Sequence, residues 1–340
     1  MIWQIDILVL SLLVLCALAA ISLKDLLSAA IVFGAYSFLM CLLWTEMAAV
    51  DVAFTEAAVG AGVSTVFFVA AIFQTTRLVS PRKSGRFFYK FLGLLMSSVL
   101  GLVLFFAAHD FPDWADPTAP ASIHVSPYYI SNTIEDTSVP NIVTSVLADY
   151  RGFDTMFETA VIFVAGLAVL LILRHYGKVE AGEEIHKISP PKAMESQIVT
   201  TISRMLVPFI QLYALYVVAH GHHSPGGGFQ GGVILGASFI LLGLSYDLDA
   251  INSRLSETWD ILFANLGIFI YAGIGAICVV LGADFLDYSI LGTVIPGFDE
   301  VTARSHGIFG VEIGVAFTVM AIMVAIYVNI SSHGKYDKGL

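Results

Sequence analysis

The chain has 340 residues, of which 57% are hydrophobic and only 13% charged, about half of the roughly 25% that a soluble domain carries. This composition excludes an ordinary soluble domain, and the formal net charge of −11 argues against nucleic acid as a partner. Most apolar segments run for about 18 residues or more, which suits helices that cross a hydrocarbon core and is too long for barrel strands. We therefore predict an all-α integral membrane protein, because a helix satisfies its own backbone polar groups in lipid.

About nine transmembrane helices are predicted along the chain, at about residues 2–21, 26–44, 53–74, 89–109, 156–173, 198–219, 229–246, 258–282 and 305–330. The first segment begins with an acidic rather than a basic region, so we predict a retained helix and not a cleaved signal. Cys16, Cys41 and Cys278 lie in apolar runs without CxxC spacing, which predicts buried packing residues and neither a disulfide nor a zinc site.

Positive charge is distributed unevenly between the predicted loops. Arg151 and Arg304 fall on one side of the membrane, whereas the other fourteen of the sixteen Lys and Arg residues fall on the opposite side. Cytoplasmic loops carry the excess of positive charge. We therefore predict that the N-terminus lies outside and the C-terminus lies in the cytoplasm.

The charged loops divide the chain into three predicted domains. The segments "RLVSPRKSGRFFYK" and "RHYGKVEAGEEIHKISPPKAMES" separate a three-helix domain (1–80), a two-helix domain (81–190) and a four-helix domain (191–340). An acidic external loop at residues 110–154 contains five prolines and no hydrophobic pattern of a soluble domain. We predict that this loop is a partly ordered cap.

The segment "HGHHSPGGGFQGG" at residues 220–232 joins two predicted spans and has three interpretations. A zinc site lacks a carboxylate or cysteine to complete its ligands, and a phosphate-binding loop lacks the required lysine and strand. The third interpretation is a packed or re-entrant elbow, in which Pro225 ends the preceding structure and Gly226, Gly227 and Gly228 permit close backbone approach. We favour the elbow and predict no bound metal.

Small residues continue into the following helix. Glycines recur at helical spacing in the seventh and ninth spans, which predicts that another helix packs tightly against each. The residues concerned are Gly232, Gly236 and Gly243 in the seventh span and Gly307, Gly310 and Gly314 in the ninth, and Gly231 is a further packing residue of the elbow. Ordinary helix packing without a transport role remains an equal alternative for them.

Ionisable side chains within the spans predict a hydrated path or a protein interior, because a charge in lipid is costly. Glu312 lies on the order of 10 Å along the ninth span, with His306 near the start of that helix. Glu56 lies one turn into the third span, after Asp51 and before two glycines that weaken the helix and favour a π-bulge beside the carboxylate. A structural role near the headgroups is the alternative for each acid.

Two further polar groups have the spacing of a shared helix face. Asp154 and Glu158 are four residues apart at the outer end of the fifth span. In the sixth span, Pro208 frees a backbone carbonyl, and Gln211 with Tyr213, Tyr216 and His220 forms a polar stripe that can hold water. Carboxylates and histidines at intermediate depth are what a proton or cation relay requires.

Three sequence segments resemble subunits of known membrane complexes. The segment from "KDLLSAAIVFG" to "TEAAVGAG" resembles the D-type subunit of membrane-bound hydrogenases and the C-terminal part of the large A-type subunit of Mrp-type sodium/proton antiporters. "FDTMFETAVIF" resembles the intervening E-type domain, and "HGHHSPGGGFQGGVILGASFIL" resembles the B-type subunit of the antiporter. Together these segments cover nearly the whole chain.

The resemblance implies a non-enzymatic subunit of a multi-subunit cation/proton antiporter in a prokaryotic cytoplasmic membrane, without a cofactor. It implies a path for Na⁺ and H⁺ near Glu56 and the elbow, and other subunits as partners, since the fourteen-helix proton-pumping unit is not found in this chain. An equivalent subunit of a redox-driven hydrogenase-type complex and a non-conducting structural adaptor are the alternatives. A metalloenzyme built on the histidine cluster is a third.

Overall fold

The computed structural model describes residues 3–79, 86–113, 116–179, 197–332 and 334. Within these residues every regular element is helical, and nine helices are long and apolar enough to cross a membrane. The prediction of an all-α membrane protein with nine spans is therefore confirmed. The predicted domain boundaries near residues 80 and 190, and many loop charges, lie outside the described residues; these charges include Arg82, Lys83, Lys187, Lys192, Lys335 and Lys338.

The chain forms two compact units. The smaller unit, Leu78–Asn132, contains α5 (Arg86–His109) and α6 (Pro120–Ile123). The described side chains of α5 are exposed along its whole length, which suits a surface covered by lipid or by another protein.

The predicted cap at 110–154 is more helical than expected, because it also contains α7 (Val125–Thr137), α8 (Ile142–Ser145) and η2 (Val146–Tyr150).

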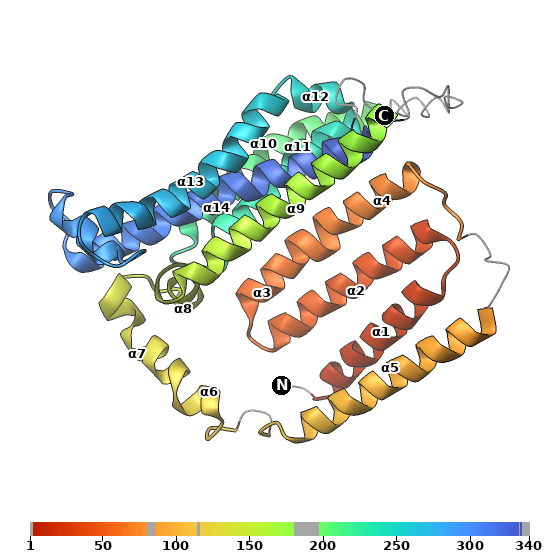
Figure 1. Ribbon diagram of the computed structural model, residues 1–340, viewed down its shortest axis with the longest axis horizontal. Coiled ribbons are helices and arrows are strands. Elements are labelled where there is room, and N and C mark those ends of the chain that lie inside the picture. The colour runs from red at the N-terminus through yellow and green to blue at the C-terminus, as the bar shows by residue number, and fades with distance from the viewer. Residues whose placement is uncertain (1–2, 80–85, 114–115, 180–196, 333, 335–340) are drawn as a thin grey trace. The chain divides into compact units, whose positions relative to one another are not determined.

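The larger unit begins with α1 (Trp3–Ser22) and α2 (Leu26–Glu46), which pack against each other. The third predicted span consists of α3 (Val50–Thr55), the π-helical segment η1 (Glu56–Ser64) and α4 (Thr65–Phe73). This confirms the irregularity that the glycines beside Glu56 predict. Figure 1 shows α2 beside α3 and α4.

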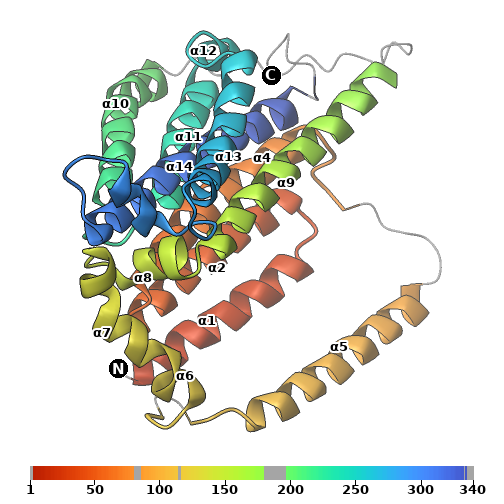
Figure 2. The same ribbon diagram turned by 60° about the vertical axis from the view of Figure 1, so that its left-hand side comes forward.

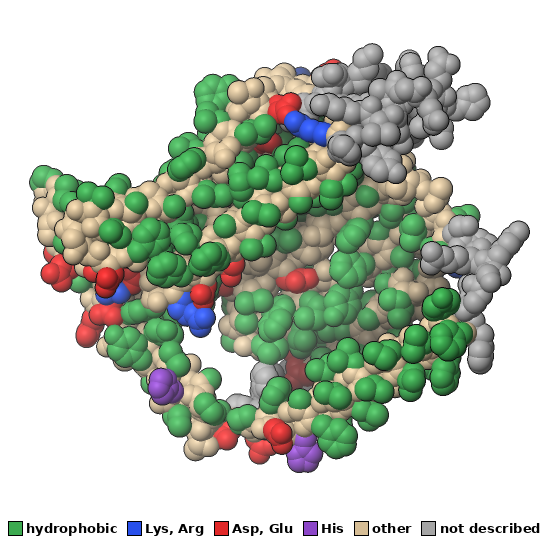
Figure 3. Space-filling view, viewed as in Figure 1, with side chains coloured by type: hydrophobic (Ala, Val, Ile, Leu, Met, Phe, Trp, Pro, Cys, Tyr) green, Lys and Arg blue, Asp and Glu red, His purple; other side chains and the backbone are tan. Residues whose placement is uncertain are grey.

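The rest of the larger unit is a helical bundle arranged around α14, which is buried along most of its length. Helices α9, α11 and α13 contact α14, and α10 packs on α11; Figure 2 shows these helices from a second side. The bounds are α9 (Gly152–Val179), α10 (Gln197–His220), α11 (Gly228–Ser245), α12 (Leu248–Asn252), α13 (Glu257–Val280), η4 (Tyr288–Thr293) and α14 (Glu300–Ser331). In Figure 3, hydrophobic side chains cover the sides of these helices, and most charged side chains lie near helix ends.

Glycines allow this bundle to pack closely, as the spacing of the small residues predicts. A Cβ atom at Gly232 would lie only 2.8 Å from the carbonyl oxygen of Ala316, and one at Gly314 only 2.6 Å from the carbonyl oxygen of Gly267. Both distances are shorter than real carbon contacts, so larger side chains would force α14 away from α11 and α13. The tight packing of α14 therefore depends on the absence of side chains at these positions.

Candidate ion-pathway site

The elbow at residues 220–232 connects the end of α10 at His220 to the start of α11 at Gly228. Its backbone has φ values of 129° at Gly226 and 144° at Gly227, a region that side-chain-bearing residues rarely adopt. Gly226, Gly227 and Gly228 are all buried, whereas Pro225 is exposed. The elbow glycines therefore lie in a packed, irregular segment, and the local conformation at Gly226 and Gly227 requires glycine.

Polar groups at the start of α8 hold the elbow backbone. The amide of the Asn141 side chain donates to the carbonyl oxygens of Gly221 and Ser224, at 3.1 Å each. The hydroxyl of Thr144 donates to the same Gly221 oxygen at 2.9 Å, and the Asn141 N–H donates to the His222 carbonyl at 2.9 Å. Irregular backbone at membrane depth needs such partners, because lipid offers none.

Helix α3 contacts the elbow from another direction. The carboxylate of Asp51 accepts a hydrogen bond from the Gly226 N–H at 3.0 Å, and the side-chain amide of Gln230 donates to the Thr55 hydroxyl at 2.8 Å. Asp51 is thus a structural partner of the elbow as well as an acid. Its second carboxylate oxygen can act toward another group, since one carboxylate has several acceptor positions.

Glu312 of α14 lies directly beneath the elbow and is only 8% exposed. Its carboxylate lies against Gly227, and its main chain lies against Gly228, so a Cβ atom at either glycine would collide with it. Its Oε2 atom is buried without a hydrogen-bond partner among the described residues. His222 Nε2 lies 3.9 Å from that oxygen and is likewise buried and unpartnered.

A cavity of about 200 Å³ opens beside Glu312, and we call it the chamber. Its lining includes oxygen-bearing side chains from α3, α8, α9, α11 and α14, namely Asp51, Thr55, Thr144, Glu158, Gln230 and Glu312. Tyr271 and Val315 form part of its less polar wall. The structure therefore brings together three of the predicted acids, which are far apart in sequence, around one space lined with oxygen atoms.

Glu56 does not line the chamber, although it lies only one residue from Thr55, which does. The Glu56 carboxylate, at the start of the π-helical segment, lies over Gly60 and near the hydroxyl of Ser37 on α2. A Cβ atom at Gly60 would collide with both side chains. Glu56 and Glu312 therefore occupy separate environments within the larger unit.

The remaining predicted pathway residues do not line the chamber either. Gln211 donates to the Ser238 hydroxyl at 3.2 Å and so joins α10 to α11. The His220 ring stacks on Tyr216 with ring centres 4.9 Å apart. His306 is exposed; its Nδ1 lies 2.9 Å from the Thr302 carbonyl oxygen, and its ring lies against Phe298. Gly231 and Gly236 are packing residues, against α10 and α14 respectively.

Two further polar groups, His222 and Asp260, are not among the predicted pathway residues. His222 approaches Glu312, whereas the neighbouring His220, which the polar stripe on α10 favours, does not. Burial lowers the pKa of His222, and the nearby His223 and His306 lower it further. Asp260 in the first turn of α13 is 2% exposed, and its Oδ1 atom has no hydrogen-bond partner among the described residues. Its one signal in the sequence is an acid directly before an apolar run.

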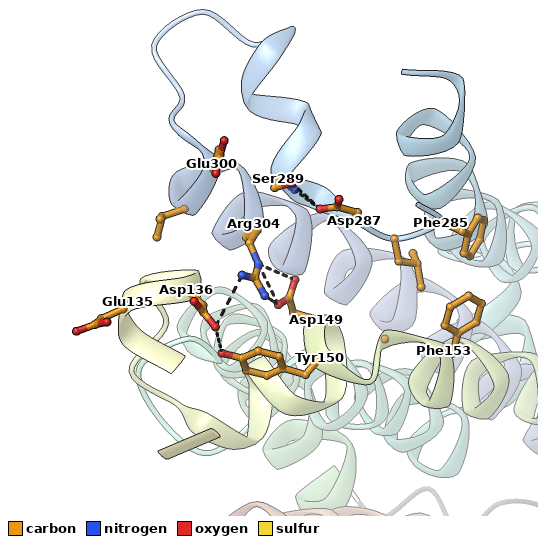
Figure 4. Close-up of a pocket in the computed structure, with 13 residues that line it drawn as sticks. Glu135, Asp136, Asp149, Tyr150, Phe153, Phe285, Asp287, Ser289, Glu300 and Arg304 are labelled. Carbon is orange, nitrogen blue, oxygen red and sulfur yellow. Dashed lines mark hydrogen bonds and ion pairs between the residues drawn. The ribbon is translucent and has the colours of Figure 1, made fainter. Parts of the chain in front are cut away.

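A second cavity, of about 540 Å³, lies where α14 begins (Figure 4). Arg304 forms an ion pair with Asp149 and lies 4.0 Å from Asp136, which accepts a 2.6 Å hydrogen bond from the Tyr150 hydroxyl. Burial raises the pKa of Asp149, and Arg304 opposes this rise. This cluster ties α14 to η2 and α7, which is a structural role for these charges.

Over the part of the chain that the structure describes, no group of three or more His, Cys, Asp or Glu side chains is arranged to hold a metal ion. The three cysteines are free thiols, and Cys278 is buried.

Comparison with protein families identifies three matching segments in order along the chain. Residues 11–77 match the D-type subunit of MBH, residues 107–188 match the E-type subunit of MBH, and residues 198–325 match a domain related to the MnhB subunit of Na⁺/H⁺ antiporters. The chamber receives residues from all three segments, because Asp51, Glu158 and Glu312 lie in the first, second and third respectively.

Individual relatives are consistent with these matches. A probable K⁺/H⁺ antiporter A/B subunit of Rhizobium meliloti is 24% identical over 63% of this chain and 23% of its own length. The putative antiporter protein mnhB2 of Staphylococcus aureus (strain Newman) is 25% identical over 39% of this chain and 93% of its own. A chain of the Mrp complex from Dietzia sp. DQ12-45-1b matches with a TM-score of 0.70 and 26% identity, over 94% of this chain and 34% of that one.

This chain thus spans about a quarter of the Rhizobium relative and about a third of the Dietzia chain. The three segment matches and the likeness of the fold agree with one another. One polypeptide thus carries segments that match the D-type and E-type subunits of MBH and the MnhB-related domain, and its fold is similar to that of a chain of the Mrp complex.

Proposed function

We propose that this chain is a membrane subunit of a multi-subunit antiporter that exchanges a monovalent cation for protons, and that the chamber forms part of the cation path. The observation that carries the proposal is Glu312, a buried carboxylate with an unpartnered oxygen beside an oxygen-lined cavity. A carboxylate in such a position is costly unless a proton or a cation neutralises it. Exchange of one for the other at Glu312 is the elementary step of antiport.

The chemistry of the chamber favours a monovalent cation as the other substrate. Hydroxyl, amide and carboxylate oxygens replace the hydration shell of such an ion, and the chamber offers all three kinds. The names of the relatives include both K⁺/H⁺ and Na⁺/H⁺ antiporters. We propose Na⁺ as the ion of this chain and K⁺ as the competitor that must be compared with it.

Other subunits complete the proposed assembly. Relatives of this chain belong to complexes of several subunits, and we propose that separate chains here supply the proton-pumping helices. The bias of loop charges supports an external N-terminus and a cytoplasmic C-terminus in a prokaryotic cytoplasmic membrane. The matches to the D-type and E-type subunits of MBH support, as a second candidate, a redox-driven parent complex that uses the same chamber.

The direct test is neutralisation of Glu312 in the intact complex. Glu312→Gln preserves the size of the side chain and removes its ability to exchange charge, so we expect exchange to fall by more than about tenfold. The complex is purified through a tag on this chain and reconstituted into proteoliposomes, and Na⁺-driven and K⁺-driven proton movements are measured separately. Asp284→Asn, at an exposed loop acid, is the matched control and is expected to retain activity.

Assembly must be measured alongside transport. If Glu312→Gln complexes contain all subunits and exchange both ions at the wild-type rate, the chamber is not on the path, and the structural-adaptor alternative replaces it.

A further inference from the structure

His222 and Glu312 form a pair that the cation path alone does not explain. Their facing atoms, Nε2 and Oε2, are 3.9 Å apart, and both are buried without a hydrogen-bond partner in the described part of the chain. Buried polar atoms are nearly always paired, so two unpaired atoms facing each other call for a shared ligand. The gap is too long for a direct hydrogen bond and suits one bridging water molecule.

The position of the His222 ring is fixed by its surroundings. The His222 carbonyl accepts a hydrogen bond from the Asn141 N–H at 2.9 Å, and the preceding carbonyl, that of Gly221, accepts from Thr144. The ring meets Phe309 of α14 edge to face, with ring centres 5.8 Å apart. An imidazole that is held in this way faces Glu312 without the need for a rearrangement of the elbow.

His222 is slightly more exposed than Glu312 and has exposed titratable neighbours. Its side chain is 15% exposed, compared with 11% for the side chain of Glu312. The titratable groups around it are Glu312 and His306 from α14, His223 from the elbow, and Asp51 from α3, which binds the elbow at Gly226. His223 and His306 are both exposed, so a proton that reaches His222 has exchangeable neighbours at the surface.

We propose that His222 is the proton acceptor for Glu312, so that the two residues form a proton-exchange site beside the chamber, which Glu312 lines. The inference rests on the proposed cation path and adds the route of the proton. When a cation binds, protonated Glu312 gives its proton through the bridging water to neutral His222 and becomes the carboxylate that neutralises the cation. His222 then releases the proton to surface water, so that one proton leaves for each cation bound.

The ionisation of His222 supports this order of events. Its lowered pKa keeps the ring neutral near neutral pH, which is the state that accepts a proton. The same low pKa makes the protonated ring a good donor to water, so the proton does not remain on the elbow.

The experiment compares His222→Gln with His223→Gln in the intact complex, reconstituted into proteoliposomes and supplied with NaCl or KCl. We expect His222→Gln to lower the maximal exchange rate by more than about tenfold while KM for the cation changes by less than about twofold, because the cation ligands remain. We also expect the pH dependence of exchange below about pH 6.5, where the ring of His222 gains its proton, to flatten in this variant. His223→Gln, whose exposed ring lies against His220, is expected to retain the wild-type rate and profile.

The outcomes separate this inference from the proposed function. Wild-type rate and pH profile in His222→Gln, with Glu312→Gln inactive, overturn the role of His222 and leave the cation path intact. Full activity in both variants overturns the proposed function itself. Should His222→Gln fail to assemble, the wild-type complex is treated with diethyl pyrocarbonate and its modified histidines are quantified by mass spectrometry. The inference predicts that the exchange rate falls in proportion to the fraction of His222 that is modified. An unchanged exchange rate after His222 is modified contradicts the inference.

Discussion

At the scale of single residues, Gly228 shows why the elbow tolerates no side chain. A Cβ atom there would collide with the carbonyl oxygen of Glu312, which belongs to the backbone of a buried helix and cannot move aside. Overpacking of a close-packed interior costs about 1–3 kcal/mol even where side chains can adjust. Gly228 therefore couples the stability of the elbow to the position of Glu312.

We predict that Gly228→Ala destabilises the protein by about 3 kcal/mol or more, because the clash involves main chain on both sides. The measurement is thermal unfolding of the purified complex in detergent. Gly273→Ala on α13 is the control, since no atom lies within 4 Å of a Cβ at that position in the described structure. Equal melting temperatures for the two variants would show that the main chain of α14 shifts enough to accommodate the added methyl group at residue 228.

The elbow residues could be predicted from sequence, but the partner of Glu312 could not. Pro225 and the glycines after it indicate an irregular backbone wherever they occur. The proximity of His222 to Glu312 depends on how α14 packs beneath the elbow, and no local pattern contains that information. Sequence spacing favours His220, because it lies on a helical stripe with Tyr216, and the structure shows that this stripe is an aromatic stack.

At the scale of elements, the third span shows how a local irregularity separates neighbouring acids. Gly60 and Gly62 favour the π-helical segment η1, which the sequence predicts. The direction of Glu56 was not predictable, because a wider turn rotates the following side chains relative to a regular helix. Thr55 faces the chamber, whereas the adjacent Glu56 faces α2.

We predict that Gly60→Ala lowers cation/proton exchange by about tenfold or more, because the new methyl group displaces the Glu56 carboxylate from its position near Ser37. Gly62→Ala is the matched control within the same π-helical segment, since the atom nearest to its Cβ is 3.4 Å away. Exchange is measured in proteoliposomes, with the subunit composition of the complex as the check on assembly. A Gly60→Ala complex that transports like Gly62→Ala would show that the position of Glu56 does not matter for transport.

At the scale of the whole molecule, hydropathy predicted the number of spans but not their roles. Helix α14 is as apolar as its neighbours, yet 78% of its most apolar window is buried, compared with 11% for α1. In lipid, polarity no longer distinguishes inside from outside, because buried and lipid-facing residues are both apolar. The glycines of α11 and α14 were the signal of close packing, and the meeting of Asp51, Glu158 and Glu312 around one chamber emerges only from the assembled bundle.

The central claim is that a proton and a monovalent cation compete for Glu312. It is tested most directly by labelling the wild-type complex with dicyclohexylcarbodiimide, which reacts with protonated carboxyl groups in apolar surroundings, and by quantifying the Glu312 peptide by mass spectrometry. The account predicts that labelling of Glu312 falls as NaCl or KCl is raised, and that choline chloride has no such effect. Labelling of Glu312 that is the same in all three salts would contradict it.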